Sequence, residues 1–185
     1  FTCWLYLYPL RNRGGIMANT YELIASYTAT GSVANITFSS IPSTYTDLVL
    51  DCSLRSDRAG DSDGTKLTFN GSTSGYTNTI LYGSGSAASS FSGNTDSIGN
   101  NYTSSNFNAS NIFGNMCFYI HNYAGSTNKS VSVDAVGEAN ATYAEMDLLA
   151  GLWSNTDAIT SVSIKPNIGS NFVIYSTAYL YGVSN

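Results

Sequence analysis

Apolar and polar residues alternate in short runs along most of the chain after position 20. The clearest run puts Leu48, Leu50, Cys52 and Leu54 on one side and Val49, Asp51, Ser53 and Arg55 on the other. Successive side chains of a β-strand point to opposite faces, so one face of this run is predicted to lie in a core and the other in water. The pattern predicts a half-buried strand.

Similar runs recur through the rest of the chain. They cover residues 21–25, 36–38, 67–69, 112–120, 131–135, 146–150, 162–164 and 172–180. In the run 146–150 the apolar side is formed by Met146, Leu148 and Ala150. The first two runs flank the turn Thr30-Gly31-Ser32, so they are expected to pair with each other. About eight to ten strands separated by turns predict an all-β fold, an antiparallel β-sandwich, and favour jelly-roll topology.

Two segments differ from this pattern. Residues 83–111 are rich in Ser, Gly and Asn, and we expect a long polar loop, functional or disordered, within a single domain spanning 17–185. Residues 1–16 begin with an aromatic stretch whose basic residues follow it, which disfavours an export signal. Because Arg13-Gly14-Gly15 can be encoded by a ribosome-binding purine run, we expect an upstream translation artefact before a true start at Met17. The alternatives are a genuine tail or strand, or an export signal.

Composition excludes several classes of protein. A length of 185 residues fits one domain. Only 10% of residues are charged and the net charge is −5, which argues against a nucleic-acid partner. No apolar stretch approaches the roughly 20 residues of a membrane helix, so a soluble protein without a membrane partner is predicted. The three cysteines include no closely spaced pair, which disfavours a zinc site or a disulfide framework.

The sequence contains few residues or motifs that are suited to catalysis. His121 is the only histidine and stands at the end of an apolar run, with no G-x-S-x-G motif in the chain, so a structural role is favoured. Asp134, Glu138, Glu145 and Asp147 form the only dense acidic group away from turns, but a glycosidase needs opposed carboxylates and Asp134 should point outward. We therefore predict a protein that is not an enzyme, with no catalytic residue and no cofactor.

A short acidic segment gives one weak metal candidate. Asp57, Asp61 and Asp63 precede Gly64, which half matches the spacing of a calcium loop but lacks its closing Glu. An acidic surface turn whose Asp side chains bond nearby backbone is the favoured interpretation.

Several blocks of sequence, taken in order, resemble a group of small virion structural proteins of tailed bacteriophages. They occupy residues 17–25, 36–50, 67–71, 120–123, 151–153, 158–162, 169–172 and 176–183, and the last reads Ser-Thr-Ala-Tyr-Leu-Tyr-Gly-Val. The resemblance implies a β-sandwich displayed on a virion as a capsid decoration, head-fibre or tail-fibre module, assembled as a homo-oligomer. It implies no catalytic residues, and it places the chain in the virion after synthesis in a bacterial host. Residues 83–111 are longer and more polar than the family pattern.

The leading interpretation is thus a non-enzymatic virion structural protein whose partners are its own copies, as a trimer, and other virion proteins. Large aromatics are enriched at interfaces and also fill cores, so one group is assigned to an oligomer interface or to the core: Trp153, Tyr175, Tyr179 and Tyr181. The alternative is a carbohydrate-binding module for a host surface glycan, since aromatics stack on sugars. Its candidate residues are Tyr76, Tyr82, Phe91, Tyr102 and Phe107. A glycan-cleaving tailspike enzyme is the third possibility.

Overall fold

The computed structural model describes residues 21–139 and 144–184, with the Asn100 side chain excepted. The regular elements among these residues are all strands, and none is a helix. The strands are β1 (Tyr21–Thr28), β2 (Ile36–Phe38), β3 (Asp47–Leu54), β4 (Asp63–Phe69), β5 (Tyr76–Gly83), β6 (Ala88–Thr95), β7 (Ile98–Thr103), β8 (Gly114–Ile120), β9 (Lys129–Glu138), β10 (Ala144–Trp153), β11 (Val162–Pro166) and β12 (Thr177–Val183). The predicted all-β class is confirmed. The expectations for residues 1–16 and the start at Met17 lie outside the described residues.

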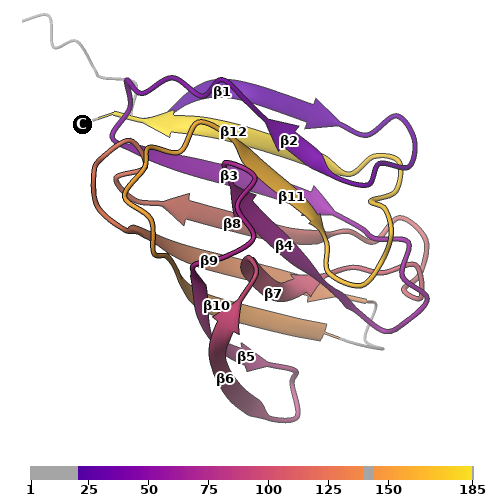
Figure 1. Ribbon diagram of the computed structural model, residues 1–185. Helices are drawn as coiled ribbons and strands as arrows, with labels where there is room; N and C mark the ends of the chain where they lie inside the picture. Colours follow the sequence, from indigo (N-terminus) through magenta and orange to yellow (C-terminus); the bar gives the residue numbers. More distant parts are fainter. Residues whose placement is uncertain (1–20, 140–143, 185) are drawn as a thin grey trace, which may run out of the picture.

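The strands form two antiparallel sheets that pack as a sandwich (Figure 1). The larger sheet has the order β1-β12-β3-β8-β9-β10-β5-β6, and the smaller has the order β2-β11-β4-β7. The chain crosses between sheets from β1 to β2, β2 to β3, and β3 to β4. The β5–β6 hairpin extends past the smaller sheet (Figure 1), so the inner face of this end of the larger sheet is only partly covered.

The core lies between the sheets and follows the two-residue period of the strands. Leu50, Phe118 and Leu180 are buried on the inner face of the larger sheet, and Leu67 and Ile164 face them from the smaller one. Burial of apolar side chains at about 25 cal/mol per Å² is the main stabilising contribution to such a fold. The alternation seen in the sequence therefore correctly located most core strands.

An aromatic cluster ties the two sheets together at the edge of this core. The Trp153 ring of β10 stacks on Tyr76 of β5, with ring centroids 6.0 Å apart, and lies 5.5 Å from Phe69 of β4 in the smaller sheet. The Tyr76 hydroxyl accepts a 2.9 Å hydrogen bond from the Phe69 amide. The cluster thus combines apolar burial with a satisfied polar group.

The expected pairing of the first two strands was wrong. β1 pairs with β12 and β2 pairs with β11, in different sheets. The segment after Gly31 does not close a hairpin, because Val33 forms a bridge to Phe172 and carries the chain across to the smaller sheet. Alternation identifies a strand, but it contains no information about the partner strand.

The predicted loop at residues 83–111 was also wrong for much of its length, since it contains β6 and β7. All eight residues of β6 are exposed, so this strand needs no apolar face and shows no alternation in the sequence. Beyond β7 the chain is held by Arg55, whose buried guanidinium donates to the carbonyl oxygens of Asn108, Ala109 and Ile112 at 3.0, 2.6 and 3.3 Å.

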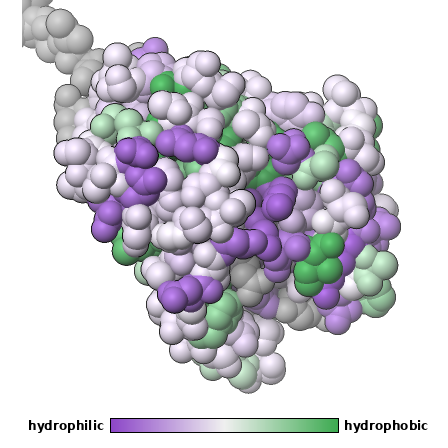
Figure 2. Space-filling model, viewed as in Figure 1, coloured by the Kyte–Doolittle hydropathy of each residue, from purple (hydrophilic) through white to green (hydrophobic). Residues whose placement is uncertain are grey.

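The surface on the side of the smaller sheet is mostly pale or purple in Figure 2, with apolar atoms in small separate groups. None of the described residues belongs to a helix long and apolar enough to cross a membrane.

Candidate functional site

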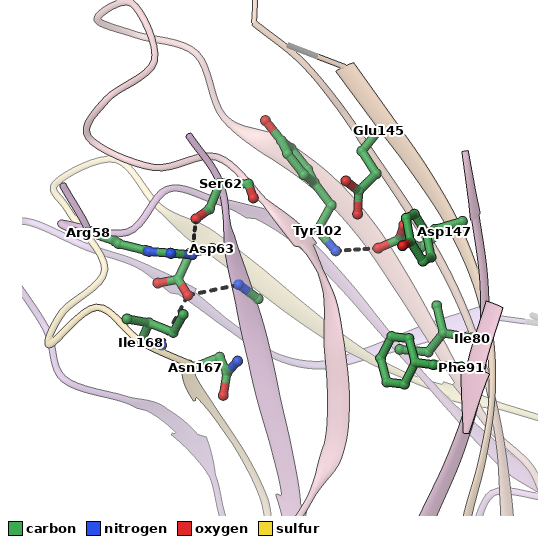
Figure 3. A pocket seen from close by; sticks show the side chains of 12 residues that line it. Arg58, Ser62, Asp63, Ile80, Phe91, Tyr102, Glu145, Asp147, Asn167 and Ile168 are labelled. Carbon is green, nitrogen blue, oxygen red and sulfur yellow. Dashed lines mark hydrogen bonds between the residues drawn. The ribbon is translucent and has the colours of Figure 1, made fainter. Parts of the chain in front are cut away.

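A pocket of about 310 Å³ lies where the β5–β6 hairpin extends beyond the smaller sheet (Figure 3). Its size is near the lower end of the range for small-molecule sites. The pocket is lined by Arg58, Ser62, Asp63, Gly64, Ile80, Tyr82, Phe91, Tyr102, Glu145, Asp147, Asn167 and Ile168. Its lining combines acidic, basic and aromatic side chains, in contrast to the apolar core beside it.

One wall carries two carboxyl groups from β10. Glu145 and Asp147 are two residues apart on the strand and so share its inner face. Asp147 is only 3% exposed, and its Oδ2 accepts a hydrogen bond from the Tyr102 amide of β7 (Figure 3). Its Oδ1 is buried as well and accepts no hydrogen bond from a described donor.

Burial raises the pKa of Asp147 to about 7, because desolvation disfavours the charged form. The Tyr102 amide acts in the opposite direction, while the charge of Glu145 and a hydrogen bond between the two carboxyls raise the pKa further. Asp147 therefore keeps its proton until the pH rises to about 7.

The register of the strands determines which side chains form the floor of the pocket. Tyr82 of β5 pairs with Asp147, and Ile80 pairs with Phe91 of β6, so these side chains lie in neighbouring rows on one sheet face. Gly137 of β9 makes room for the Tyr102 ring, since a Cβ at that position would overlap the ring atoms. The site therefore depends on β5, β6, β7, β9 and β10 together.

The opposite wall is fixed by Asp63 at the start of β4. Its carboxylate accepts hydrogen bonds from the amides of Gly64 and Ile168 at 2.8 and 3.0 Å (Figure 3) and from the Gly169 amide at 2.9 Å. Arg58 donates to the Ser62 carbonyl oxygen on the same wall. Asp63 thereby holds the segment after β11 against the pocket and has no free role as a ligand.

Asp63→Ala is expected to lower the free energy of unfolding by about 3 kcal/mol, because three amides lose a charged acceptor. Urea unfolding measures the change. The matched control is Asp61→Ala at the exposed neighbouring turn, which should stay within about 0.5 kcal/mol of the parent. Equal losses in the two variants would contradict this role of Asp63.

The structure separates the five predicted sugar-binding aromatics into two groups. Tyr82, Phe91 and Tyr102 meet at the pocket. Tyr76 is buried in the core against Trp153, and Phe107 is 70% exposed on the segment after β7, away from the pocket lining. Two pocket residues of a different kind, Glu145 and Asp147, were grouped by the sequence only as an acidic cluster.

The four predicted interface aromatics do not form one surface. Trp153 is buried in the core and is not available to a partner. Tyr175 is exposed in a left-handed backbone conformation before β12, with φ of 73°. Tyr179 and Tyr181 belong to β12, and the Tyr181 ring lies edge-on to Tyr21, with centroids 6.3 Å apart.

Two of the three weak calcium candidates, Asp57 and Asp63, bond to backbone amides. Asp57 Oδ1 accepts amide hydrogen bonds from Ser170 and Asn171 at 2.8 and 3.0 Å. Partial burial alone would raise the pKa of Asp57, but these hydrogen bonds outweigh it and hold the pKa below its ordinary value. Asp61 is exposed, and the described part of the chain contains no cluster of three or more His, Cys, Asp or Glu residues suited to a metal ion.

His121 lies on the surface beside a buried carboxylate. Its Nδ1 is 3.0 Å from Asp47 Oδ1, which also accepts the Asn122 amide at 2.7 Å. The Tyr119 hydroxyl donates to Asp47 Oδ2 at 2.6 Å, and this bond raises the pKa of Tyr119 to about 12. Asp47 thus accepts hydrogen bonds that fix the turn after β8.

The outer face of the larger sheet carries a second feature, which we name the outer apolar patch. It consists of Leu81, Val136, Met146 and Leu148, each between 47% and 66% exposed. Val136 pairs with Met146 and Leu81 with Leu148 across strands, and the patch borders a depression of about 360 Å³. The run 146–150 therefore turns its apolar side outward, while Asp147, Leu149 and Trp153 point inward.

Comparison of the chain with known protein families, with curated proteins and with solved structures finds no match in any of the three.

Proposed function

We propose that this chain is a non-enzymatic structural protein of a bacteriophage virion, acting by self-assembly and surface display. The single observation that carries the proposal is the outer apolar patch. An apolar group of this kind on a soluble protein marks an interaction surface. The resemblance of the ordered sequence blocks to small virion proteins supplies the biological setting.

The fold supports this assignment. We infer jelly-roll winding, because β1-β12-β3-β8 and β2-β11-β4-β7 reproduce the strand orders of two interleaved Greek keys. The β5–β6 and β9–β10 hairpins are then additions that widen one sheet. Viral capsid and lectin domains are among the proteins that use this architecture.

The position of the patch favours self-association at the widened end of the sheet. β5, β9 and β10 carry the patch, and β6 beside them is an edge strand with all its side chains exposed. An unpaired edge next to an apolar surface offers both backbone hydrogen bonds and apolar burial to another copy. We therefore expect a stable homo-oligomer, a trimer.

Light scattering coupled to gel filtration tests this expectation. The parent chain should elute as an oligomer, and Met146→Ser combined with Leu148→Ser should shift it to monomer. Both positions are exposed in the single chain, so the fold tolerates the changes, but the contact between copies loses its apolar burial. The control is Phe107→Ser at an exposed position outside both the patch and the group of predicted interface aromatics. A strict monomer at high concentration, or an oligomer unaffected by the double variant, would contradict the proposal.

Mass spectrometry of purified phage particles tests the virion assignment separately. The chain should be found in particles after extensive washing, in a fixed ratio to the other structural proteins. Its absence from particles of the phage that encodes it would exclude the virion role even if the chain oligomerises.

A second candidate function is carbohydrate binding at the virion surface. The observation that favours it is that Tyr82 of β5 and Phe91 of β6 line one pocket, beside the buried Tyr102 of β7. Display and binding are compatible, since the pocket lies on the inner face of the sheet and the outer apolar patch lies on the other.

A further inference from the structure

We propose that the outer apolar patch of one copy packs against a different surface of the next copy, so that the copies join head to tail in a closed ring. The second surface lies on β1 and β12, and we name it the tyrosine surface. It consists of Tyr21, Leu23, Tyr179 and Tyr181. This inference rests on the proposed self-assembly and names the partner of the same patch.

Strand pairing shows that the two surfaces lie on one face of the larger sheet. Residues directly opposite each other in an antiparallel pair point to the same side of the sheet. An unbroken series of such pairs leads from the tyrosine surface to the patch, through Tyr179, Asp51, Cys117, Asp134, Leu148 and Leu81. Neighbouring strands are about 4.8 Å apart, so Tyr179 and Leu148 are separated by about 19 Å along the sheet and belong to separate surfaces.

The tyrosine surface has the composition of an interface. Tyr21, Leu23 and Tyr179 are 54%, 51% and 37% exposed. Val49 pairs with Tyr181 on the same face and is only 2% exposed, which indicates that the rings beside it cover it. None of the four members carries a charge, and three carry a hydroxyl at the end of an apolar ring. Tyrosine is enriched in interface cores, and charged residues are depleted there.

A contact between two copies of the patch alone would bury too little surface. Exposed apolar patches cover roughly 300–600 Å², whereas a stable interface buries about 800 Å² on each partner. Such a contact would also bring acidic groups together, because Asp134 and Glu138 are exposed beside the patch on β9. Against the tyrosine surface these carboxylates meet hydroxyls, which can donate hydrogen bonds to them.

The twist of the sheet turns the two surfaces in different directions. Adjacent strands rotate by about 20°, so the steps from β12 through β3, β8 and β9 to β10 add up to roughly 80°. A second copy packed face to face therefore cannot cover both surfaces at once. A head-to-tail contact uses each surface once on every copy, and it closes into a ring when the rotation between copies permits it. A trimer is the smallest ring of this kind.

The experiment removes each surface separately in the full chain. Met146→Ser with Leu148→Ser removes the patch, and Leu23→Ser with Tyr179→Ser removes the tyrosine surface. Light scattering coupled to gel filtration should show a monomer for each double variant, and circular dichroism with urea unfolding confirms that each is folded. Leu23→Ser alone, on the edge strand β1, repeats the test with a smaller change and should weaken association about tenfold or more.

The two double variants are then mixed in equal amounts at high concentration, with a small mass tag on one of them. The intact patch of one variant can bind the intact tyrosine surface of the other, and the pair cannot extend further, so the mixture should give a dimer with one copy of each. The matched control is Phe107→Ser with Ile168→Ser, which changes two exposed apolar residues outside both surfaces and should keep the mass of the parent oligomer.

Each outcome decides the proposal. Two monomeric variants whose mixture gives a one-to-one dimer support it. A tyrosine-surface variant that keeps the parent mass overturns it, while the patch variant still decides the proposed self-assembly. Dimers of each variant alone would indicate two separate two-fold contacts, and folded monomers that do not associate in the mixture would show that the surfaces do not bind each other. Either result overturns the inference, and a monomeric parent overturns the self-assembly as well.

Discussion

Trp153→Ala is expected to lower the free energy of unfolding by about 4 kcal/mol, within the range for removing a large aromatic from a core. Trp153 is fully buried and contacts Tyr76 in its own sheet and Phe69 in the other. Its removal leaves a cavity at the contact between sheets and ends the stacking. Since domains of this kind are stable by only about 5–15 kcal/mol, the loss is a large part of the total.

Urea unfolding followed by far-ultraviolet circular dichroism measures this effect. Trp153→Phe keeps an aromatic ring and should cost less than half as much, whereas Tyr175→Ala on the surface should be nearly neutral. A loss below about 1 kcal/mol for Trp153→Ala would mean that the cluster does not hold the sheets together. It would also reopen the sequence-based assignment of Trp153 to an interface.

The fold class followed from the sequence because half-buried strands leave a two-residue pattern. Leu48, Leu50, Cys52 and Leu54 of β3 are all buried, as the alternation predicts. The sequence contains no comparable pattern that shows which strands pair, so the predicted partner of β1 was wrong. β6 was missed because an edge strand exposed on both faces has no pattern to detect.

The run 146–150 illustrates how alternation can be assigned to the wrong face. Both sides of β10 contain apolar residues, and the more regular set, Met146 and Leu148, faces outward. The inner side is interrupted by Asp147, which a simple hydrophobic pattern excludes from a core. Asp147 is thus an exception to the rule that inward-facing positions are apolar, and it lies beside a pocket. Exceptions of this kind are found most often at functional sites.

The pocket itself could be predicted only in part. Tyr82, Phe91 and Tyr102 were selected as aromatics that could stack on a sugar, but their position at one pocket depends on the register of β5, β6 and β7. Asp63 and Arg58 enter from a segment about twenty residues or more away in sequence, through the packing of the smaller sheet. Long-range pairing of this kind is set by tertiary structure, which a single sequence does not encode in any local signal.

Asp147→Asn is expected to stabilise the protein above pH 7 and to have little effect near pH 4. The folded-state pKa of Asp147 is about 7 against an ordinary value of 3.8, since burial and the neighbouring Glu145 disfavour ionisation. The folded protein therefore holds a proton that the unfolded chain releases between these values. Stability falls as the pH rises from about 4 to 7 and is level above that.

The variant removes this titration. An Asn amide accepts from the Tyr102 amide and donates to Glu145, as the protonated acid does. One pKa unit corresponds to about 1.4 kcal/mol, so the difference between the ordinary and the raised pKa of Asp147 limits the increase in unfolding free energy at pH 8 to about 4 kcal/mol. Urea unfolding of parent and variant at pH 4, 5, 6, 7 and 8 should give a difference that grows with pH and then stays constant.

Asp134→Asn is the matched control, because Asp134 lies exposed on the neighbouring strand β9 and its carboxylate remains in water. The free energy of unfolding of Asp134→Asn should stay close to that of the parent at each of the five pH values. A difference between Asp147→Asn and the parent that does not vary with pH would mean that the pKa of Asp147 is not raised in the folded protein.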